Sequence, residues 1–305
     1  MSEPSSPHPP GEQVDLGGYP VFVRTMPGTE PDREPALFVH GLGGSSRNWT
    51  ELMDLLRSGL DCAAVDLPGF GDSPPRPDGR YSMDALAQTT ATLIERQGRG
   101  PVHLVGNSLG GAVCLRLAAR RPHLVKTLTL ISPALPDPHP RLDLVRFPLV
   151  GIPRLGDWLL TRYQTLPAER RVAATFTTCY ADPARVPEDR FEAEVAELKK
   201  RDTLPYAADA LIGCVRTITS EALRPWSGWH DAPRIEVPTL VIFGTDDRLV
   251  NARLAGRAAR AFRNARVVVL PDTGHVAQME HPEQVAAEMR ALGIPAHAGR
   301  LSLEG

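Results

Sequence analysis

The sequence predicts an α/β protein with a mainly parallel, doubly wound sheet and an inserted helical cap. Three observations lead to this prediction. Short apolar runs alternate with amphipathic helical patterns, the alternation breaks between residues 133 and 233, and it then resumes. Alternation of this kind is typical of parallel strands covered by helices on both faces, and ligands bind such sheets outside the carboxyl ends of the strands.

Six short runs rich in apolar and β-branched residues predict strands buried on both faces. Between them, apolar residues recur at helical spacing over 49–56 and 83–94. Ser82 is expected to cap the second of these helices and Gly98 to end it, and a further helix is expected at 112–120. The predicted strands are residues 36–40, 62–67, 102–106, 125–132, 238–244 and 265–271.

Residues 1–13 are rich in proline and serine and carry neither a basic segment nor an apolar core. This composition predicts a disordered tail and not a secretion signal. No apolar run reaches the roughly 18 residues of a membrane span, so we expect no stable membrane insertion and a cytoplasmic location. We assign the α/β core to residues 14–134 and 234–296, the helical cap to 135–233 and a second tail to 297–305.

The cap segment is helix-like, is interrupted by prolines, and is enriched in aromatic residues. Such rings suit the lining of an apolar pocket; the alternative is that they only hold a small helical subdomain together. The amphipathic run 141–163 is expected to pack over the site, with a position on a membrane as the alternative. The aromatic residues are Trp158, Trp226, Trp229, Tyr163, Tyr180 and Tyr206.

Charge and cysteine content restrict the classes of partner. The chain has 34 basic and 36 acidic side chains and a net charge of −2, so no overall field favours nucleic acid or anionic lipid. We therefore expect a small, apolar molecule as the partner. Cys62, Cys114, Cys179 and Cys214 are widely separated and lack metal-ligand spacing, which predicts buried free thiols in a reducing compartment.

The stretch LVGNSLGGA, residues 104–112, places Ser108 between a predicted strand and a predicted helix. A serine at that position lies on a sharp turn that lifts its hydroxyl above the sheet. Gly106 and Gly110 stand two residues to either side, where strand and helix pass too closely for a side chain. The pattern G-x-S-x-G is weak alone and becomes specific in this strand–turn–helix setting.

A serine hydroxyl needs a histidine to remove its proton, and the histidine needs a carboxylate to orient it. In this topology the expected chain order is serine, acid, histidine, each following a strand. Asp246 and Asp247 follow the predicted strand 238–244, and His275 follows the strand 265–271. Elementary chemistry does not distinguish the two adjacent aspartates.

Five motifs in this order make the chain resemble the α/β-hydrolase fold superfamily, in the capped group of esterases, small lipases, carbon–carbon bond hydrolases and cofactor-free haloperoxidases. The resemblance implies a serine hydrolase without cofactor or metal, and it implies that Asp247 is the acid of the triad. The motifs are HGLGG (40–44), DLPGFGDS (66–73), GNSLGG (106–111), GTDDRLV (244–250) and GHVAQMEHP (274–282).

Ester cleavage also needs an oxyanion hole of two preorganised backbone N–H groups. The Leu109 amide follows the nucleophile at a helix N-terminus, where the dipole favours an anion. The resemblance assigns the second amide to Leu42 and gives His40 the role of ordering this loop, with a second base as the alternative. His281, which precedes a proline, is expected to begin the last helix and not to bind metal.

The sequence therefore predicts acyl transfer to water through Ser108, Asp247 and His275, with Leu42 and Leu109 as oxyanion donors. A serine at position 108 excludes haloalkane dehalogenase and epoxide hydrolase chemistry, which need a carboxylate nucleophile there. The expected substrate is a small or medium apolar carboxylic ester. Three alternatives remain: a carbon–carbon bond hydrolase of a ring-cleavage product, a haloperoxidase-like perhydrolase, and a ligand-binding receptor on a hydrolase scaffold.

Overall fold

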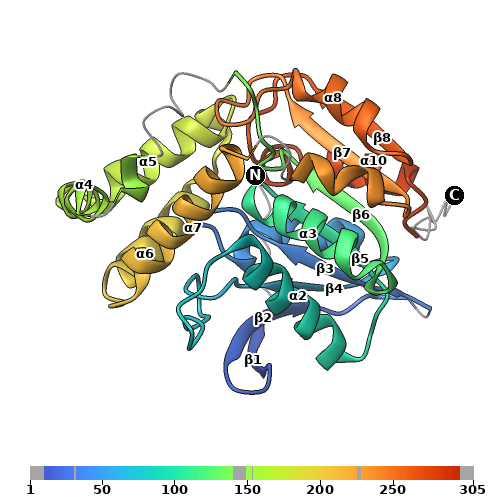
Figure 1. Ribbon diagram of the computed structural model, residues 1–305, viewed down its shortest axis with the longest axis horizontal. Helices are drawn as coiled ribbons and strands as arrows, with labels where there is room; N and C mark the ends of the chain where they lie inside the picture. Colours follow the sequence, from blue (N-terminus) through green and yellow to red (C-terminus); the bar gives the residue numbers. More distant parts are fainter. Residues whose placement is uncertain (1–9, 31, 140–148, 153, 225–227, 296–305) are drawn as a thin grey trace, which may run out of the picture.

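The computed structural model describes residues 10–30, 32–139, 149–152, 154–224 and 228–295. Within them, an eight-stranded sheet has the order β1-β2-β4-β3-β5-β6-β7-β8 (Figure 1). The first two strands pair antiparallel and the other six run parallel to one another. The strands are β1 (Gly11–Asp15), β2 (Pro20–Met26), β3 (Glu34–Val39), β4 (Leu60–Val65), β5 (Val102–Asn107), β6 (Val125–Ile131), β7 (Thr239–Gly244) and β8 (Ala265–Leu270).

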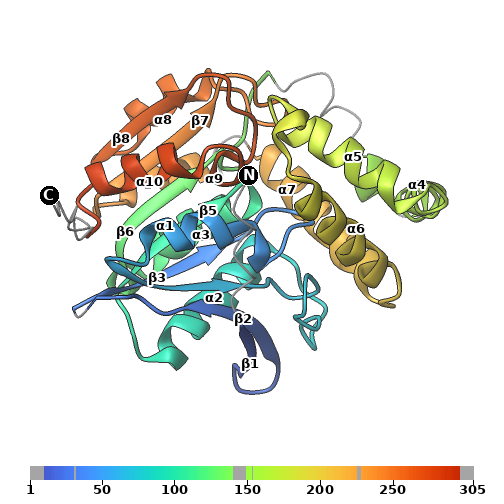
Figure 2. The same cartoon turned by 180° about the vertical axis from the view of Figure 1, so that it is seen from behind.

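Helices cover both faces of this sheet (Figures 1 and 2). Successive side chains of a strand point to opposite faces, so Leu37 and Val39 of β3 pack in one core cluster and Ala36 and Phe38 in the other. The first cluster includes residues of α2 (Met83–Gln97), α3 (Leu109–Arg120) and α8 (Leu254–Ala261). The second includes residues of α1 (Thr50–Leu56), α9 (Ala277–Glu280) and α10 (Pro282–Ala291). The predicted fold class is confirmed.

The six predicted strands correspond to β3–β8, with ends that differ by up to two residues. The caps of α2 also match the prediction: the Ser82 side chain accepts from the Ala85 amide at 3.2 Å, and Gly98 adopts φ 62° at the C-terminus. Three-residue or four-residue 3₁₀ turns occur at Ser46–Trp49, Pro122–Leu124, Pro183–Arg185, Gly228–His230 and Ala232–Arg234.

The N-terminal strands were not predicted, and one boundary was wrong. Gly11–Gln13, assigned above to the disordered tail, belong to β1 and pair with β2. β1 is mostly exposed, so its sequence carries no apolar pattern; the backbone pairing orders it. Of the other tail residues, Pro10 is exposed, and 1–9 and 297–305 lie outside the described residues.

The segment between β6 and β7 is helical, and Figures 1 and 2 place it to one side of the sheet. Its helices α5 and α6 enclose a small apolar cluster that includes Phe176, Tyr180 and Leu198. Residues of α7 and the following turns instead join the main core, among them Cys214 and Trp229. The four helices are α4 (Leu155–Gln164), α5 (Ala168–Cys179), α6 (Glu188–Asp202) and α7 (Ala207–Ala222).

Candidate active site

Ser108 lies on the turn between β5 and α3 in a strained backbone conformation, with φ 54° and ψ −116°. A non-glycine residue in a sparsely populated region costs on the order of 1–3 kcal/mol and persists only where its surroundings hold it. Here the Ser108 amide donates to the Ile131 carbonyl at 3.0 Å, and its carbonyl accepts from the amides of Ala112 at 3.1 Å and Ala134 at 3.0 Å. The side chain is half-buried.

The two glycines of the motif are required by close backbone approach. A Cβ on Gly106 would lie 2.5 Å from the Gly110 carbonyl oxygen, and a Cβ on Gly110 would lie 2.2 Å from the Val39 carbonyl oxygen. Real Cβ atoms do not approach backbone oxygen so closely, because the atoms would overlap. The strand, the turn and the helix therefore meet at Ser108 as the motif predicts.

His275 and Asp247 form a buried pair. Like Ser108, both follow the carboxyl ends of parallel strands. Nδ1 of His275 lies 2.9 Å from Oδ2 of Asp247 and 3.1 Å from Oδ1. The second oxygen also accepts from the amides of Leu249 at 2.8 Å and Val250 at 2.9 Å. Burial would raise the pKa of Asp247, but the His275 charge and hydrogen bond and the Val250 amide outweigh it, so the pKa lies below its usual value.

Asn107 links the histidine loop to the serine turn. Its side-chain amide donates to the His275 carbonyl oxygen at 3.0 Å and to the Ile131 carbonyl oxygen at 3.1 Å. Asn107 directly precedes Ser108, so the backbone of His275 is held against the turn that carries the hydroxyl. Asn107 was not predicted as a site residue, although a polar residue at the end of an apolar strand is a usable signal in the sequence; in the structure its side chain is buried and hydrogen-bonded.

The candidate oxyanion amides lie on two adjoining segments. Leu109 is the first residue of α3, where the amides have no partner within the helix. Leu42 lies in a turn closed by the Gly44 amide and the Gly41 carbonyl at 3.2 Å, in which Gly43 has φ 74°. A Cβ on Gly41 would lie 3.1 Å from the Cβ of Ser108. The turn is thus packed against the serine.

His40 orders this turn from beneath. Its Nδ1 lies 2.7 Å from the Gly41 carbonyl oxygen, and its Nε2 lies 2.9 Å from the Leu67 amide nitrogen. A carbonyl only accepts and an amide only donates, so Nδ1 carries the proton and the ring is neutral. Burial lowers the pKa of His40 further than the nearby Asp66 and the Gly41 carbonyl raise it. Both ring nitrogens are occupied, which agrees with the ordering role.

The cap helix α6 presents charged side chains to the core loops, which the sequence analysis did not foresee. Apolar residues were expected over the site, yet one side of this helix contacts the core through charged side chains. Burial raises the pKa of Glu194 on the same helix. The contacts are an Arg190–Glu51 pair, an Arg47–Glu197 pair at 3.7 Å and a bond from Nη1 of Arg201 to the Gly43 carbonyl oxygen at 2.9 Å.

The cap aromatics are dispersed. Trp158 is 61% exposed, and Nε1 of Trp229 donates to the Pro136 carbonyl oxygen within the main core. Tyr180 is buried between α5 and α6, and Tyr206 lines a cavity of about 430 Å³ beside α7. Trp226 lies outside the described residues. These rings do not form a common lining, so the subdomain alternative describes them better.

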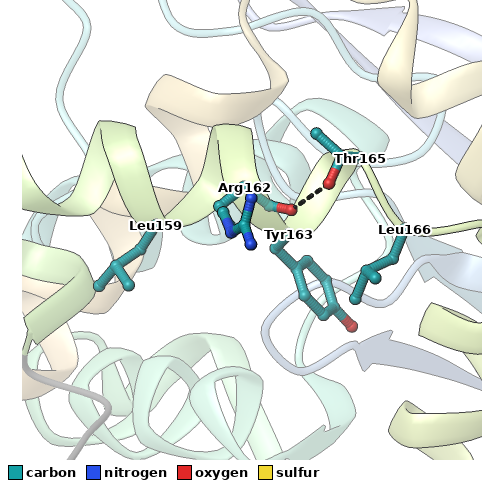
Figure 3. A pocket seen from close by; sticks show the side chains of 5 residues that line it. All are labelled: Leu159, Arg162, Tyr163, Thr165 and Leu166. Atoms are coloured by element: carbon teal, nitrogen blue, oxygen red, sulfur yellow. Dashed lines mark hydrogen bonds between the residues drawn. The ribbon is translucent and has the colours of Figure 1, made fainter.

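Helix α4 is largely exposed. Gly156 is its one buried residue among those described, which contradicts the expectation that the run 141–163 packs over the site; residues 141–148 and 153 of that run lie outside the described part. A cavity of about 380 Å³ lies beside α4 and the turn after it, and Figure 3 shows the side chains that line it. Its lining residues are Leu159, Arg162, Tyr163, Thr165 and Leu166, and they include no member of the predicted triad.

The expectation that His281 begins the last helix is confirmed: His281 is the N-cap residue of α10, and its ring contacts Arg185 and the Asp272 carbonyl. All four cysteines are free; three are buried and Cys179 is half-buried. The described residues include no cluster of three or more His, Cys, Asp or Glu side chains suited to a metal ion. Among the described helices, none is long and apolar enough to cross a membrane.

Comparisons with known proteins bear on the family to which the chain belongs. The family model described as alpha/beta hydrolase fold matches residues 35–282. The chain is 32% identical to the putative carbamate hydrolase RutD of Pseudomonas savastanoi pv. phaseolicola, over 79% of this chain and 86% of that protein. It is 28% identical to a 2-hydroxy-6-oxononadienedioate/2-hydroxy-6-oxononatrienedioate hydrolase of Burkholderia vietnamiensis, over 84% and 85%.

Two further comparisons bear on fold and length. The crystal structure of a putative lipase from Acinetobacter baumannii superimposes with a TM-score of 0.73 at 22% identity, covering 92% of this chain and 90% of that one. The chain spans 62% of the length of a dihydrolipoyllysine-residue acetyltransferase component of an acetoin cleaving system from Pseudomonas putida, at 30% identity over 84% of this chain. With the serine turn, the sheet order and the family match taken together, this chain belongs to the α/β-hydrolase fold family of enzymes.

Proposed function

We propose that this protein is a serine hydrolase that cleaves a small or medium apolar carboxylic ester through an acyl-enzyme. The observation that carries the proposal is the buried Asp247–His275 pair, held by Asn107 against the strained turn of Ser108. A hydroxyl, a base and an orienting acid at the carboxyl edge of a parallel sheet are the parts that nucleophilic acyl transfer needs.

The reaction follows from these positions. Asp247 holds Nδ1 of His275, which leaves Nε2 to take the proton of Ser108 as the hydroxyl oxygen attacks the ester carbonyl. The resulting oxyanion accepts hydrogen bonds from the amides of Leu42 and Leu109. His275 then gives its proton to the departing alcohol. Water, deprotonated by His275, attacks the acyl-enzyme carbonyl. The bond between the acyl carbon and Oγ of Ser108 then breaks, His275 returns the proton to Oγ, and the carboxylic acid leaves.

Relatives support acyl chemistry in general and differ in substrate. RutD is named a putative carbamate hydrolase, and carbamate cleavage, like ester cleavage, breaks a bond between a carbonyl carbon and a heteroatom. The Burkholderia vietnamiensis relative is named for a dienoate substrate, and this likeness favours carbon–carbon bond hydrolysis as the second candidate. We rank ester cleavage first because it needs no polar pocket for a substrate carboxylate.

The first experiment is hydrolysis of p-nitrophenyl esters of increasing acyl length. Ser108→Ala is the test variant, and Ser58→Ala, in the turn between α1 and β4 at the opposite edge of the sheet, is the matched control. We expect Ser108→Ala to lose about 10⁴-fold or more in kcat and Ser58→Ala to retain wild-type turnover. The acyl length that is hydrolysed fastest would indicate the size of the pocket that binds the acyl group.

Other results would redirect the assignment. Wild-type turnover no faster than that of Ser108→Ala on every ester would reject the ester proposal. Turnover of a ring-cleavage dienone by the same serine would then establish the carbon–carbon bond hydrolase. Saturable binding of an ester without turnover would support a receptor on a hydrolase scaffold.

A further inference from the structure

The cap touches the histidine loop through its backbone, at the end of α5. The His275 amide donates to the Cys179 carbonyl oxygen at 2.6 Å. A Cβ on Gly274 would lie 2.3 Å from that same oxygen and 2.6 Å from the Ala181 nitrogen. Gly274 therefore allows the histidine loop and the cap segment to pack directly against each other. The backbone amide of His275, the candidate base, has a cap residue as its hydrogen-bond partner.

A single carboxylate joins the two segments. Glu280, in the short helix α9, has a side chain with 0% exposure. It accepts from the Gly274 amide at 2.7 Å on the loop side and from the amides of Ala181 at 3.1 Å and Asp182 at 3.2 Å on the cap side. A buried carboxylate is costly unless donors surround it. The loop and the cap are thus both needed to satisfy Glu280.

Arg185 closes the arrangement from the cap side. Its Nη1 lies 3.0 Å from the Asp272 carbonyl oxygen, 3.4 Å from Oε1 of Glu280 and 2.8 Å from Nε2 of His281. Its side chain is 39% exposed, so it reaches the buried carboxylate from the surface. One guanidinium therefore spans the residues on both sides of the histidine loop.

We propose that Arg185 and Glu280 are positioning residues that align His275 only when the cap is seated on the core. This inference rests on the proposed function, because it assigns His275 the role of base. Movement of the Cys179–Arg185 segment would remove two amides and a guanidinium from Glu280, and would remove the carbonyl partner of the His275 amide. Displacement of the cap would therefore release the histidine loop at the same time.

The test compares Arg185→Ala, Arg185→Lys and Glu280→Gln with wild type in the full chain. Arg170→Ala is the matched control, since Arg170 is an exposed cap arginine whose side chain makes no hydrogen bond or ion pair with the described residues. A fluorophosphonate probe measures the base directly, because His275 must deprotonate Ser108 before phosphorus is attacked. The saturating labelling rate and the probe's half-saturation concentration are determined separately.

We expect Arg185→Ala and Glu280→Gln to lower the saturating labelling rate between about tenfold and a hundredfold, the scale of a ~1 Å misplacement of a catalytic group. The half-saturation concentration should change less than threefold. Arg185→Lys should recover part of the rate, since its ammonium can reach one acceptor. Arg170→Ala should match wild type. Rates within twofold of wild type in both Arg185→Ala and Glu280→Gln, corrected for the folded fraction, would overturn the proposal.

Hydrogen exchange separates this proposal from the proposed function. In Arg185→Ala we expect faster exchange of the amides of Gly274, His275 and Ala181, and unchanged exchange in β3 and β5. Unchanged exchange at those three amides overturns the positioning role, whatever the labelling rates. Absence of labelling at Ser108 in the wild-type protein would refute the proposed serine hydrolase. It would also refute the role of Arg185 and Glu280 in aligning a base, even if hydrogen exchange shows that both residues hold the histidine loop in place.

Discussion

Asp246 and Asp247 are neighbours in the chain, yet one is exposed to solvent and the other is fully buried against His275. Asp246 accepts from the Thr245 hydroxyl at 2.6 Å, within its own turn. Asp247 lies 2.9 Å from Nδ1 of His275. The carboxylate that reaches the histidine is thus the second of the pair, which is the one that the motif resemblance indicated.

This difference gives a direct test of the acid. Asp247→Asn should lower kcat by about 10⁴-fold, since an amide at this position favours the wrong imidazole tautomer. Asp246→Asn, one residue away, should leave kcat within a few fold of wild type because its side chain bonds only within its turn among the described residues. Steady-state ester hydrolysis measures both. Equal losses in the two variants would contradict the assignment.

The candidate site was predictable where the backbone imposes the residue type. Gly106, Ser108 and Gly110 follow from the meeting of strand and helix, and His275 follows from its place after a strand. The choice between Asp246 and Asp247 required resemblance, because burial depends on the whole fold. The contacts of Glu280 with Ala181 and Asp182 were not predictable. The two partners lie 99 and 98 positions away along the chain, and they meet Glu280 only through tertiary packing.

The lowered pKa of Asp247 predicts a pH effect on stability. The pKa in the folded state lies below the usual 3.8, so ionisation of Asp247 stabilises the fold above pH 3.8 and this contribution is lost as the pH falls through the folded-state pKa. Urea unfolding of wild type and Asp247→Asn should therefore show a difference in free energy of unfolding that is larger at pH 6 than at pH 3. A difference that stays constant or grows on acidification would contradict the linkage.

Substitution of glycine by alanine is expected to change stability in opposite directions in the serine turn and in α8. Gly110→Ala places a Cβ 2.2 Å from the Val39 carbonyl oxygen and should destabilise the protein by about 1–3 kcal/mol or more. Gly256→Ala, on the exposed side of α8, meets nothing closer than 3.7 Å and should stabilise by about 0.4–1 kcal/mol. Denaturant unfolding measures both. A neutral Gly110→Ala would show that strand and helix are less closely packed.

The fold was predictable where burial leaves a pattern in the sequence. β3 to β7 are mostly buried and apolar, and their runs mark them to within two residues. The run of β8 marks it equally well, but the prediction that it is buried on both faces was wrong, because Val269 is exposed. β1 is mostly exposed and polar, and its backbone pairing with β2 leaves no such pattern. The prediction for α4 was wrong for the opposite reason, because an apolar pattern is present but is not buried. Leu155 and Trp158 form an apolar stripe that suggests packing, but both remain exposed.

The variant His40→Ala tests whether a second histidine acts as a base. Its nitrogens contact the Gly41 carbonyl and the Leu67 amide, so neither is available to move a proton. In His40→Ala the Leu67 amide loses its buried acceptor, which costs about 1–3 kcal/mol in addition to the cavity. His103→Ala is the matched control, because His103 is equally buried but contacts Thr127 and Glu34 on the sheet.

Both variants should lower the free energy of unfolding, and His40→Ala should also lower kcat because the Leu42 amide loses its support. The pH at which kcat/KM falls on the acidic side should be the same as in wild type in both variants, since His40 takes no part in the proton transfer. A shift of this limb in His40→Ala alone would mean that His40 titrates with the catalytic base. Its two fixed hydrogen bonds argue against that outcome, because a ring that donates through one nitrogen and accepts through the other must break a bond before it can take up a proton.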